Sequence, residues 1–132
     1  MENTQKDRRK NTRISLELEA ELQLSEHSAY SGKTGNISFS GVYLLCMQAA
    51  KIPVGAKGML KLYLQAGPAP NAIAVRCQVV RTDESGAGIR FIHIDLEGYQ
   101  QFKNLMAYNS PDPDTLLSEL TKHPGLEIYK GP

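Results

Sequence analysis

The strongest constraint on the fold of this chain is the alternation of apolar and polar residues over residues 14–24. Every second position there is apolar: Ile14, Leu16, Leu18, Ala20, Leu22 and Leu24. Side chains that repeat with a period of two lie on one face of a β-strand, whereas a helix would distribute them around its axis. The alternation therefore predicts one long, half-buried strand over residues 14–24, although leucine and glutamate are good helix formers.

Further segments have the composition or the alternation of strands, and glycine-, proline- or polar-rich segments separate them. The expected strands cover residues 41–47, 59–64, 72–82 and 88–94, and the expected turns and loops cover residues 27–35, 51–58, 67–71 and 83–86. With the stretch around residue 37, this gives five or six short strands. Such a series predicts an antiparallel barrel or sandwich, and a barrel has the advantage of leaving no exposed sheet edge.

After residue 95 the apolar residues recur at intervals of three and four instead of two. Tyr99, Phe102, Leu105 and Met106 predict an amphipathic helix that packs on the barrel. Prolines at 111 and 113 end this helix, and Asp112 before Pro113 is a good cap for a second one. The apolar face of the second helix is expected at Leu116, Leu117 and Leu120.

The charge is concentrated at the start of the chain. Residues 1–13 have a net charge of +3, from Lys6, Arg8, Arg9, Lys10 and Arg13 against Glu2 and Asp7. The whole chain carries only +1, so the remainder is slightly acidic. Because residues 1–13 have no apolar side chain after Met1, we expect a flexible arm there, followed by a barrel with its packed helix over 14–108 and a helical tail over 109–132.

A basic arm on a nearly neutral body favours a small anionic partner over a long nucleic acid, since duplex binders usually present a broad basic face. We therefore expect no DNA or RNA partner. No apolar run approaches the roughly 20 residues that span a bilayer, so we expect no membrane insertion. The N-terminal residues lack the apolar centre of a secretory signal, and Cys46 and Cys77 form no Cys-x-x-Cys pair. These features predict a cytoplasmic protein of one domain with two reduced thiols.

The histidines give no sign of catalysis. His27, His93 and His123 have no nearby nucleophile and no spacing typical of metal ligands, so we expect them to be structural or solvated. The sequence also lacks a phosphate-binding loop of the Walker type. We therefore expect no enzyme activity, no metal and no cofactor.

One short stretch, residues 36–41, carries regularly spaced polar groups. If the stretch is a strand, Asn36, Ser38 and Ser40 share one face and Ile37 and Phe39 point into the core. Gly41 follows, where the missing side chain permits a close approach to the backbone. By itself this pattern is typical of a bulge or hairpin whose polar residues face water, and a binding site is the alternative.

Three motifs together resemble the PilZ domain family over about residues 8–108. They are Arg9-x-x-x-Arg13 on the arm, Asn36-x-Ser38-x-x-Gly41, and Gly88-Ile89-Arg90-Phe91 near the end of the expected barrel. The resemblance implies a mainly β fold, a six-stranded antiparallel barrel with C-terminal helices. It also implies binding of cyclic di-GMP, a bacterial second messenger.

The resemblance assigns roles to six residues. Arg9 and Arg13 are expected to grip bases and phosphates, because the guanidinium fork matches both a phosphate and the O6/N7 edge of guanine. Asn36 occupies a position where the family has Asp or Asn, and its carbonyl is expected to accept from guanine N–H groups. Ser38 is expected to supply a hydroxyl and Gly41 to leave room for the ligand. Arg8 directly precedes the motif and is expected to stack on a guanine face.

Two hypotheses about function follow from the resemblance. In the first, ligand binding changes the position of the arm and thereby signals to a protein effector, with one ligand or two stacked ligands bound. In the second, the chain is an interaction module of the same fold that does not bind nucleotide. In either case we expect a monomer or a weak dimer.

Overall fold

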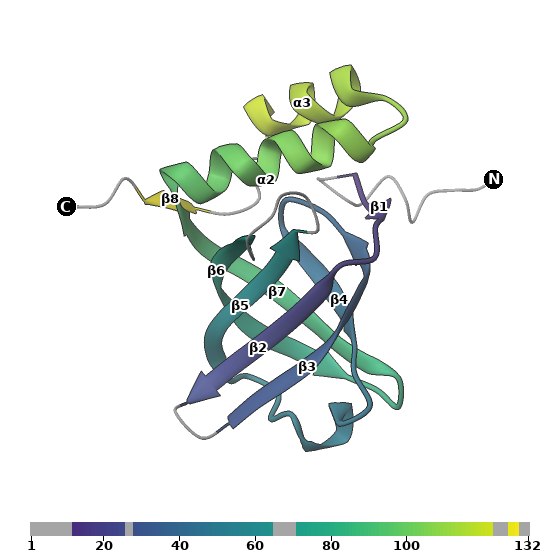
Figure 1. The fold of residues 1–132 in the computed structure, drawn as a ribbon, viewed down its shortest axis with the longest axis vertical. Coiled ribbons are helices and arrows are strands. Elements are labelled where there is room, and N and C mark those ends of the chain that lie inside the picture. Colours follow the sequence, from purple (N-terminus) through teal and green to yellow (C-terminus); the bar gives the residue numbers. More distant parts are fainter. Residues whose placement is uncertain (1–11, 26–27, 65–70, 123–126, 130–132) are drawn as a thin grey trace.

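The structure, a computed structural model, describes residues 12–25, 28–64, 71–122 and 127–129. Its elements are β1 (Ile14–Ser15), β2 (Glu19–Ser25), β3 (Ser28–Ile37), β4 (Gly41–Leu45), the 3-10 helix η1 (Ala49–Lys51), β5 (Lys57–Leu64), β6 (Asn71–Thr82), β7 (Gly86–Asp95), α2 (Leu96–Asn109), α3 (Pro113–Lys122) and β8 (Glu127–Tyr129). Six antiparallel strands follow the order β3-β2-β5-β6-β7-β4, and β4 pairs again with β3. This pairing closes the barrel (Figure 1), so the predicted fold class is confirmed.

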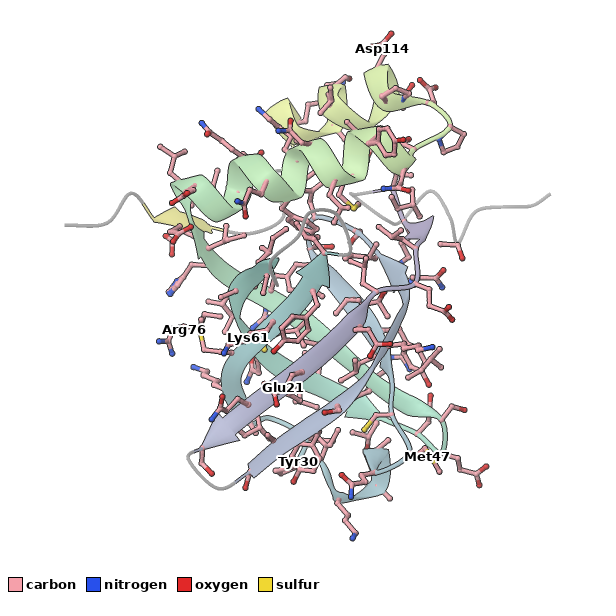
Figure 2. The ribbon with its side chains drawn as sticks, viewed as in Figure 1. Glu21, Tyr30, Met47, Lys61, Arg76 and Asp114 are labelled. Carbon is pink, nitrogen blue, oxygen red and sulfur yellow. The ribbon has the colours of Figure 1, made fainter. Side chains whose placement is uncertain are left out.

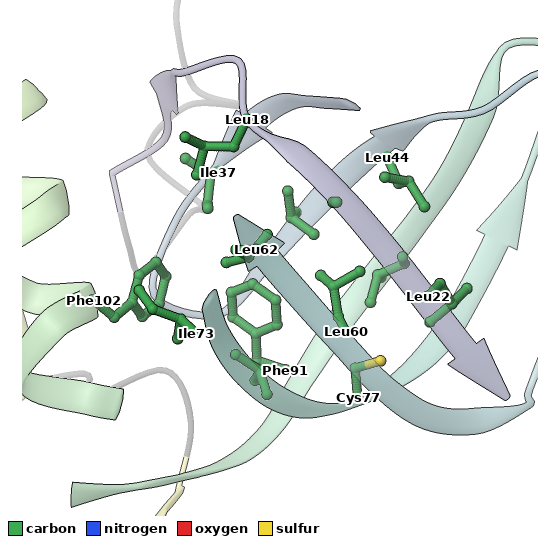
Figure 3. Close-up of a cluster of buried hydrophobic side chains, with 14 of the residues drawn as sticks. Leu18, Leu22, Ile37, Leu44, Leu60, Leu62, Ile73, Cys77, Phe91 and Phe102 are labelled. Atoms are coloured by element: carbon green, nitrogen blue, oxygen red, sulfur yellow. The ribbon is translucent and has the colours of Figure 1, made fainter. Parts of the chain in front are cut away.

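The core of the barrel consists mainly of the apolar side chains that alternate along β2, β4, β5, β6 and β7 (Figure 3). Leu22 faces Leu60 across β2 and β5, and Leu60 in turn faces Val75 of β6. Each of these three side chains is fully buried. Burying a side chain of this size stabilises a fold by about 1.5–3 kcal/mol, so the alternation read from the sequence is also the main source of stability.

The polar residues between these apolar positions lie on the outside. Figure 2 shows Glu21, Lys61 and Arg76 directed away from the barrel, on three neighbouring strands. Glu21 and Lys61 are direct cross-strand partners. Cys77, one residue after Arg76, points inward, and its burial raises the pKa of the thiol to about 12. At neutral pH this thiol is therefore protonated and behaves as a small apolar core residue.

The long strand predicted over residues 14–24 is in fact interrupted. β1 ends at Ser15 and β2 begins at Glu19, and both pair with β3. The hydroxyl of Thr34 on β3 fills the gap, because it accepts a bond of 2.8 Å from the Leu18 amide and donates to the Leu16 carbonyl. The apolar residues keep their phase through this irregularity, so the interruption could not be predicted from the alternation.

The prediction of a turn over residues 27–35 was wrong, because most of this segment belongs to β3. The segment contains few apolar residues, and the first six positions of β3 are exposed or half-buried. Its backbone nevertheless pairs with β2 on one side and with β4 on the other. Gly32 permits the second pairing, since a Cβ there would lie 2.1 Å from the Leu45 carbonyl oxygen.

Two helices cover one end of the barrel, with α2 against the strands and α3 on α2 (Figure 1). Phe102 of α2 is fully buried, and its ring lies 5.0 Å from that of Phe39 and 5.6 Å from that of Phe91. Asp112 caps α3 as predicted, accepting from the Thr115 amide at 3.2 Å. Neither described helix is long and apolar enough to cross a membrane.

The segment after α3 differs from the expected helical tail. β8 pairs in parallel with the last residues of β7. Within α3, Leu116 is buried, whereas Leu117 of the predicted apolar face is 37% exposed. The apolar face of α3 is therefore narrower than its leucines suggested.

Candidate functional site

A cleft of about 280 Å³ lies where the β3–β4 connection meets strands β6 and β7. Its polar lining residues are Arg13, Asn36, Ser38, Ser40, Tyr43, Arg81 and Arg90. Gly41 and Gly88 also border it. We call residues 36–41 the turn wall of this cleft, and residues 80, 81 and 88–90 the β6–β7 wall.

Four of the six predicted site residues border this one cleft, namely Arg13, Asn36, Ser38 and Gly41. Arg8 and Arg9 lie outside the described residues, as do most of the arm's positions. The contact of each of these residues with a ligand stays a prediction.

The turn wall is a bulge followed by a turn, one of the alternatives that the sequence left open, and not a continuous strand. β3 ends at Ile37, and its register with β4 shifts between Thr34 and Ile37. The shift leaves Asn36 exposed while Ile37 is fully buried. Phe39 is fully buried as well, so the predicted division between a core side and a polar side holds for these positions.

Ser38 stabilises the turn wall through hydrogen bonds to other residues of the same turn. Its hydroxyl oxygen accepts from the Ser40 amide at 3.1 Å and lies 3.0 Å from the Ser40 hydroxyl. Its own amide donates to the Gly41 carbonyl at 2.9 Å. Ser38 is only 4% exposed, so most of its hydrogen-bonding capacity maintains the turn.

Gly41 has a structural role that the sequence did not reveal. A Cβ at this position would lie 2.4 Å from the Ile89 carbonyl oxygen and 3.4 Å from the Arg90 Cα. Any side chain at Gly41 would therefore collide with the backbone of β7. The absent side chain at Gly41 thus lets β4 approach β7, and its expected role in leaving room for the ligand stays a prediction.

The described end of the arm is hydrogen-bonded to α3. The Thr12 amide donates to one carboxylate oxygen of Glu119 at 2.7 Å, and the Thr12 hydroxyl donates to the other at 2.5 Å. The next residue, Arg13, is exposed and borders the cleft. The same two-residue segment thus reaches both the cleft and the second C-terminal helix.

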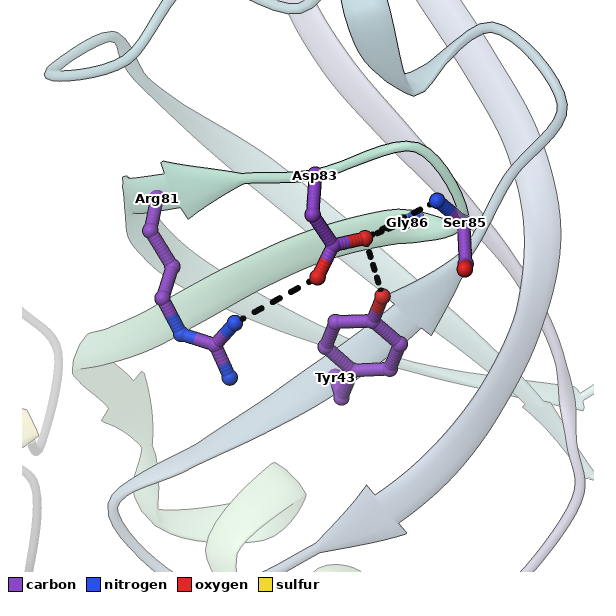
Figure 4. A network of polar contacts seen from close by, with 5 residues as sticks. All are labelled: Tyr43, Arg81, Asp83, Ser85 and Gly86. Carbon is purple, nitrogen blue, oxygen red and sulfur yellow. Dashed lines mark hydrogen bonds and ion pairs between the residues drawn. The ribbon is translucent and has the colours of Figure 1, made fainter.

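A polar network stands beside the cleft at the β6–β7 hairpin (Figure 4). Oδ1 of Asp83 accepts from the Tyr43 hydroxyl at 2.6 Å and from the amides of Ser85 and Gly86 at 2.9 and 3.0 Å. These bonds, the one from Tyr43 foremost, lower the pKa of the Asp83 carboxyl. The same bond to Asp83 raises the pKa of Tyr43, so the pair is a neutral phenol and a carboxylate at neutral pH.

Sequence reasoning missed the cations of the β6–β7 wall. Arg90 lies inside the motif 88–91 but was given no role, and its guanidinium donates to Gln78 Oε1 at 2.9 Å. Arg81 lies in the expected strand 72–82 and was not singled out at all. Charged residues on a strand are normally solvated, so only their position beside residues 36–41 indicates a function.

Electrostatically the cleft suits an anion. Among the described residues that line it, Arg13, Arg81 and Arg90 are charged, and none is acidic. Guanidinium groups bind phosphates with two parallel hydrogen bonds, and they also match planar bases. The arrangement can therefore bind a phosphorylated ligand with planar groups.

Comparison with protein families shows to which family the chain belongs. The model of the PilZ domain matches residues 7–108, which include the cleft and the part of the arm that carries Arg8, Arg9 and Arg13. The chain belongs to the PilZ domain family. PilZ domains are generally receptor and adaptor modules for cyclic di-GMP rather than enzymes.

Solved structures support the same fold. The PilZ domain of CeSA from a cellulose-synthesizing bacterium is 12% identical, with a TM-score of 0.61, and the match covers 76% of this chain and 100% of that domain. The Bacillus subtilis inhibitor of motility, MotI/DgrA, is 17% identical, with a TM-score of 0.57 over 89% of this chain. This chain spans about half (51%) of the length of the Bacillus protein. No curated protein matches the sequence.

Proposed function

We propose that this PilZ domain is a cytoplasmic receptor for cyclic di-GMP. The observation that carries the proposal is that residues from three separate motifs border one cleft: Arg13 of the arm, the turn wall, and Arg90. Two phosphates and two guanines need cations and planar donors, and arginine supplies both. In this proposal Arg9 and Arg13 grip the phosphates and base edges, and Arg8 stacks on a guanine.

The turn wall is proposed to recognise the base. Asn36 is exposed at the bulge, where its carbonyl oxygen can accept from guanine N–H groups. Ser38 and Gly41 fix the shape of this wall through the turn and through the contact with β7. The remaining capacity of the Ser38 hydroxyl then contributes a weaker bond to the ligand.

The size of the cleft supports a contribution from the arm. Pockets that bury a drug-sized ligand usually measure about 300–1,000 Å³, and this cleft of about 280 Å³ is at the lower limit. The described walls therefore enclose only part of a cyclic dinucleotide. We propose that residues 1–13 cover the rest, and that the arm changes position when the ligand binds.

The contact between Thr12 and Glu119 supports a route from the arm to an effector. A change of position at Arg13 acts on the adjacent Thr12, whose two bonds hold Glu119 of α3. We propose that α3 responds to this change and that a protein effector reads it. DNA, RNA and membrane insertion have no part in this mechanism, and the chain acts as a monomer or a weak dimer.

The test is a calorimetric titration of the chain with cyclic di-GMP. Arg9→Ala and Arg13→Ala should each weaken binding at least tenfold, since a hydrogen bond to a charged group contributes about 1.5–3 kcal/mol. Arg76→Ala is the matched control, because Arg76 is exposed on β6 and does not line the cleft. Both arm variants should keep the melting temperature of the unaltered chain.

The same titration separates the two hypotheses. Absence of binding by the unaltered chain would favour the interaction module that does not bind nucleotide. Equal affinities for all variants would contradict the assignment of the site. The stoichiometry decides between one ligand and two stacked ligands, the second of which Arg8 would favour as an additional cation.

A further inference from the structure

Arg81 has an irregular position on β6 that directs it to the cleft. Val79 pairs with Ile89 and Arg81 pairs with Gly88, so Val80 is an extra residue on β6. Val79 is fully buried and Val80 is 47% exposed. Without the bulge, Arg81 would follow Val79 in phase and point into the core. Bulges often occur beside functional sites, where they redirect a side chain.

Gly88 on the neighbouring strand accommodates the redirected side chain. A Cβ on Gly88 would lie 2.9 Å from Arg81 Cγ and 3.0 Å from Arg81 Nε. The arginine therefore lies across the bare backbone of β7, and a side chain larger than glycine would displace it. The bulge and Gly88 together place the Arg81 guanidinium at the cleft.

The guanidinium is held there by a weak ion pair. Arg81 Nη1 lies 3.6 Å from Asp83 Oδ2, and the guanidinium carbon lies 5.4 Å from the centre of the Tyr43 ring (Figure 4). The Arg81 and Asp83 side chains are 60% and 48% exposed. An exposed pair of this kind contributes little to stability.

The two carboxylate oxygens of Asp83 have different partners, so the ion pair with Arg81 can break without disturbing the hairpin. The three hydrogen bonds from Tyr43, Ser85 and Gly86 all end on Oδ1, whereas Arg81 pairs with Oδ2. Arg81 can thus leave Asp83 without breaking the bonds that fix the turn. A phosphate presents to arginine the same paired oxygens as a carboxylate and can take the place of Asp83.

We propose that Arg81 is a further ligand-binding residue, and that a phosphate of the ligand replaces Asp83 as the partner of its guanidinium. Asp83 is then a positioning residue that keeps Arg81 at the edge of the cleft in the free protein and competes with the ligand for it. This inference rests on the proposed function and adds to it a binding residue on the β6–β7 wall.

The test is a double-mutant cycle in cyclic di-GMP affinity, measured by calorimetry on the full chain. Arg81→Gln keeps much of the side chain over Gly88 and removes the charge, and it should weaken binding about tenfold. Asp83→Asn keeps an oxygen for Tyr43, Ser85 and Gly86 but removes the competing charge. It should tighten binding about two- to fivefold, the range expected for losing an exposed ion pair.

The combined variant distinguishes competition from a structural effect. If Asp83 acts only through Arg81, Asp83→Asn should have no effect on affinity in the Arg81→Gln background. Arg76→Gln on the outer face of β6 (Figure 2) is the control for the loss of a positive charge from the same strand, and its affinity should be unchanged.

Each contrary result has its own meaning. Equal affinities of Arg81→Gln, Arg76→Gln and the unaltered chain would overturn the role of Arg81 while leaving the proposed function in place. An Asp83→Asn effect that persists without Arg81 would overturn the exchange of partners. Absence of binding by the unaltered chain would overturn the proposed function and this inference with it.

Discussion

The two walls of the cleft differ in what their polar groups bond to. On the turn wall, Ser38 is almost completely buried and bonds to the backbone and side chain of its own turn. On the β6–β7 wall, Arg81 is exposed, and its guanidinium is positioned by a 3.6 Å ion pair with Asp83 and by the face of the Tyr43 ring. The comparison indicates that the first wall gives the cleft its shape and the second gives it charge. Substitutions on the turn wall should therefore change stability first, and losses of arginine should change affinity first.

The largest effect is expected at Gly41. Gly41→Ala should lower the free energy of unfolding by about 1–3 kcal/mol, because its Cβ meets the Ile89 carbonyl oxygen and forces β4 and β7 apart. Gly35→Ala is the matched control, since the nearest atom to its Cβ would be Tyr43 Cδ2 at 3.6 Å, an ordinary contact. Urea denaturation of both variants measures the difference. Equal losses would contradict the structural role assigned to Gly41.

A smaller effect is expected at Ser38. Ser38→Ala removes the acceptor of the Ser40 amide and should lower the free energy of unfolding by about 1 kcal/mol. Its effect on cyclic di-GMP affinity should be of similar size, and smaller than that of Arg13→Ala. Ser40→Ala keeps the amide bond to Ser38 and serves as the control in the same denaturation experiment. A Ser38 variant as stable as this control, yet unable to bind, would mean that the turn wall acts by direct contact instead.

Asn36→Asp tests which part of the ligand the turn wall faces. If Asn36 accepts from guanine N–H groups, a carboxylate should bind at least as tightly, since ionised acceptors form stronger hydrogen bonds. Calorimetry with cyclic di-GMP measures the change. A marked loss of affinity would place a phosphate, rather than a base, beside Asn36.

The smallest effect concerns the titration of Asp83. Its pKa is lowered first by the bond from Tyr43, so the stabilisation from the ionised carboxylate is present above the pKa of the unfolded chain and is lost as the pH falls through the lower folded pKa. Tyr43→Phe should raise the folded pKa of Asp83 toward its ordinary value, and the stabilisation should then be lost at a higher pH. NMR titration of the Asp83 carboxyl carbon measures this shift. Tyr30→Phe, whose hydroxyl bonds to the Lys51 carbonyl, should leave the titration unchanged.

The barrel was predictable because its core follows a period of two. Leu22, Leu60 and Val75 are buried where the alternation placed them. β3 was not predictable in the same way, since residues 28–33 contain few apolar side chains and are recognised as a strand only through their partners on β2 and β4. The gap between β1 and β2 was hidden for the opposite reason, because the alternation continues across it.

The site was predictable only where a motif marked it. Arg13 and Asn36 were proposed from motifs, and the structure brings them to one cleft. Arg81 could not be proposed, because a strand that continued regularly from Val79 would turn it toward the core. The bulge at Val80 depends on pairing with β7, which is a property of the folded sheet.

The central claim is that the arm and the cleft form one binding site for cyclic di-GMP. Backbone NMR order parameters of residues 5–13, measured with and without cyclic di-GMP, test it most directly. The account predicts that these order parameters rise when the ligand binds, together with shifts of the Asn36 and Gly41 amide signals. Order parameters that stay the same while calorimetry records binding would contradict it.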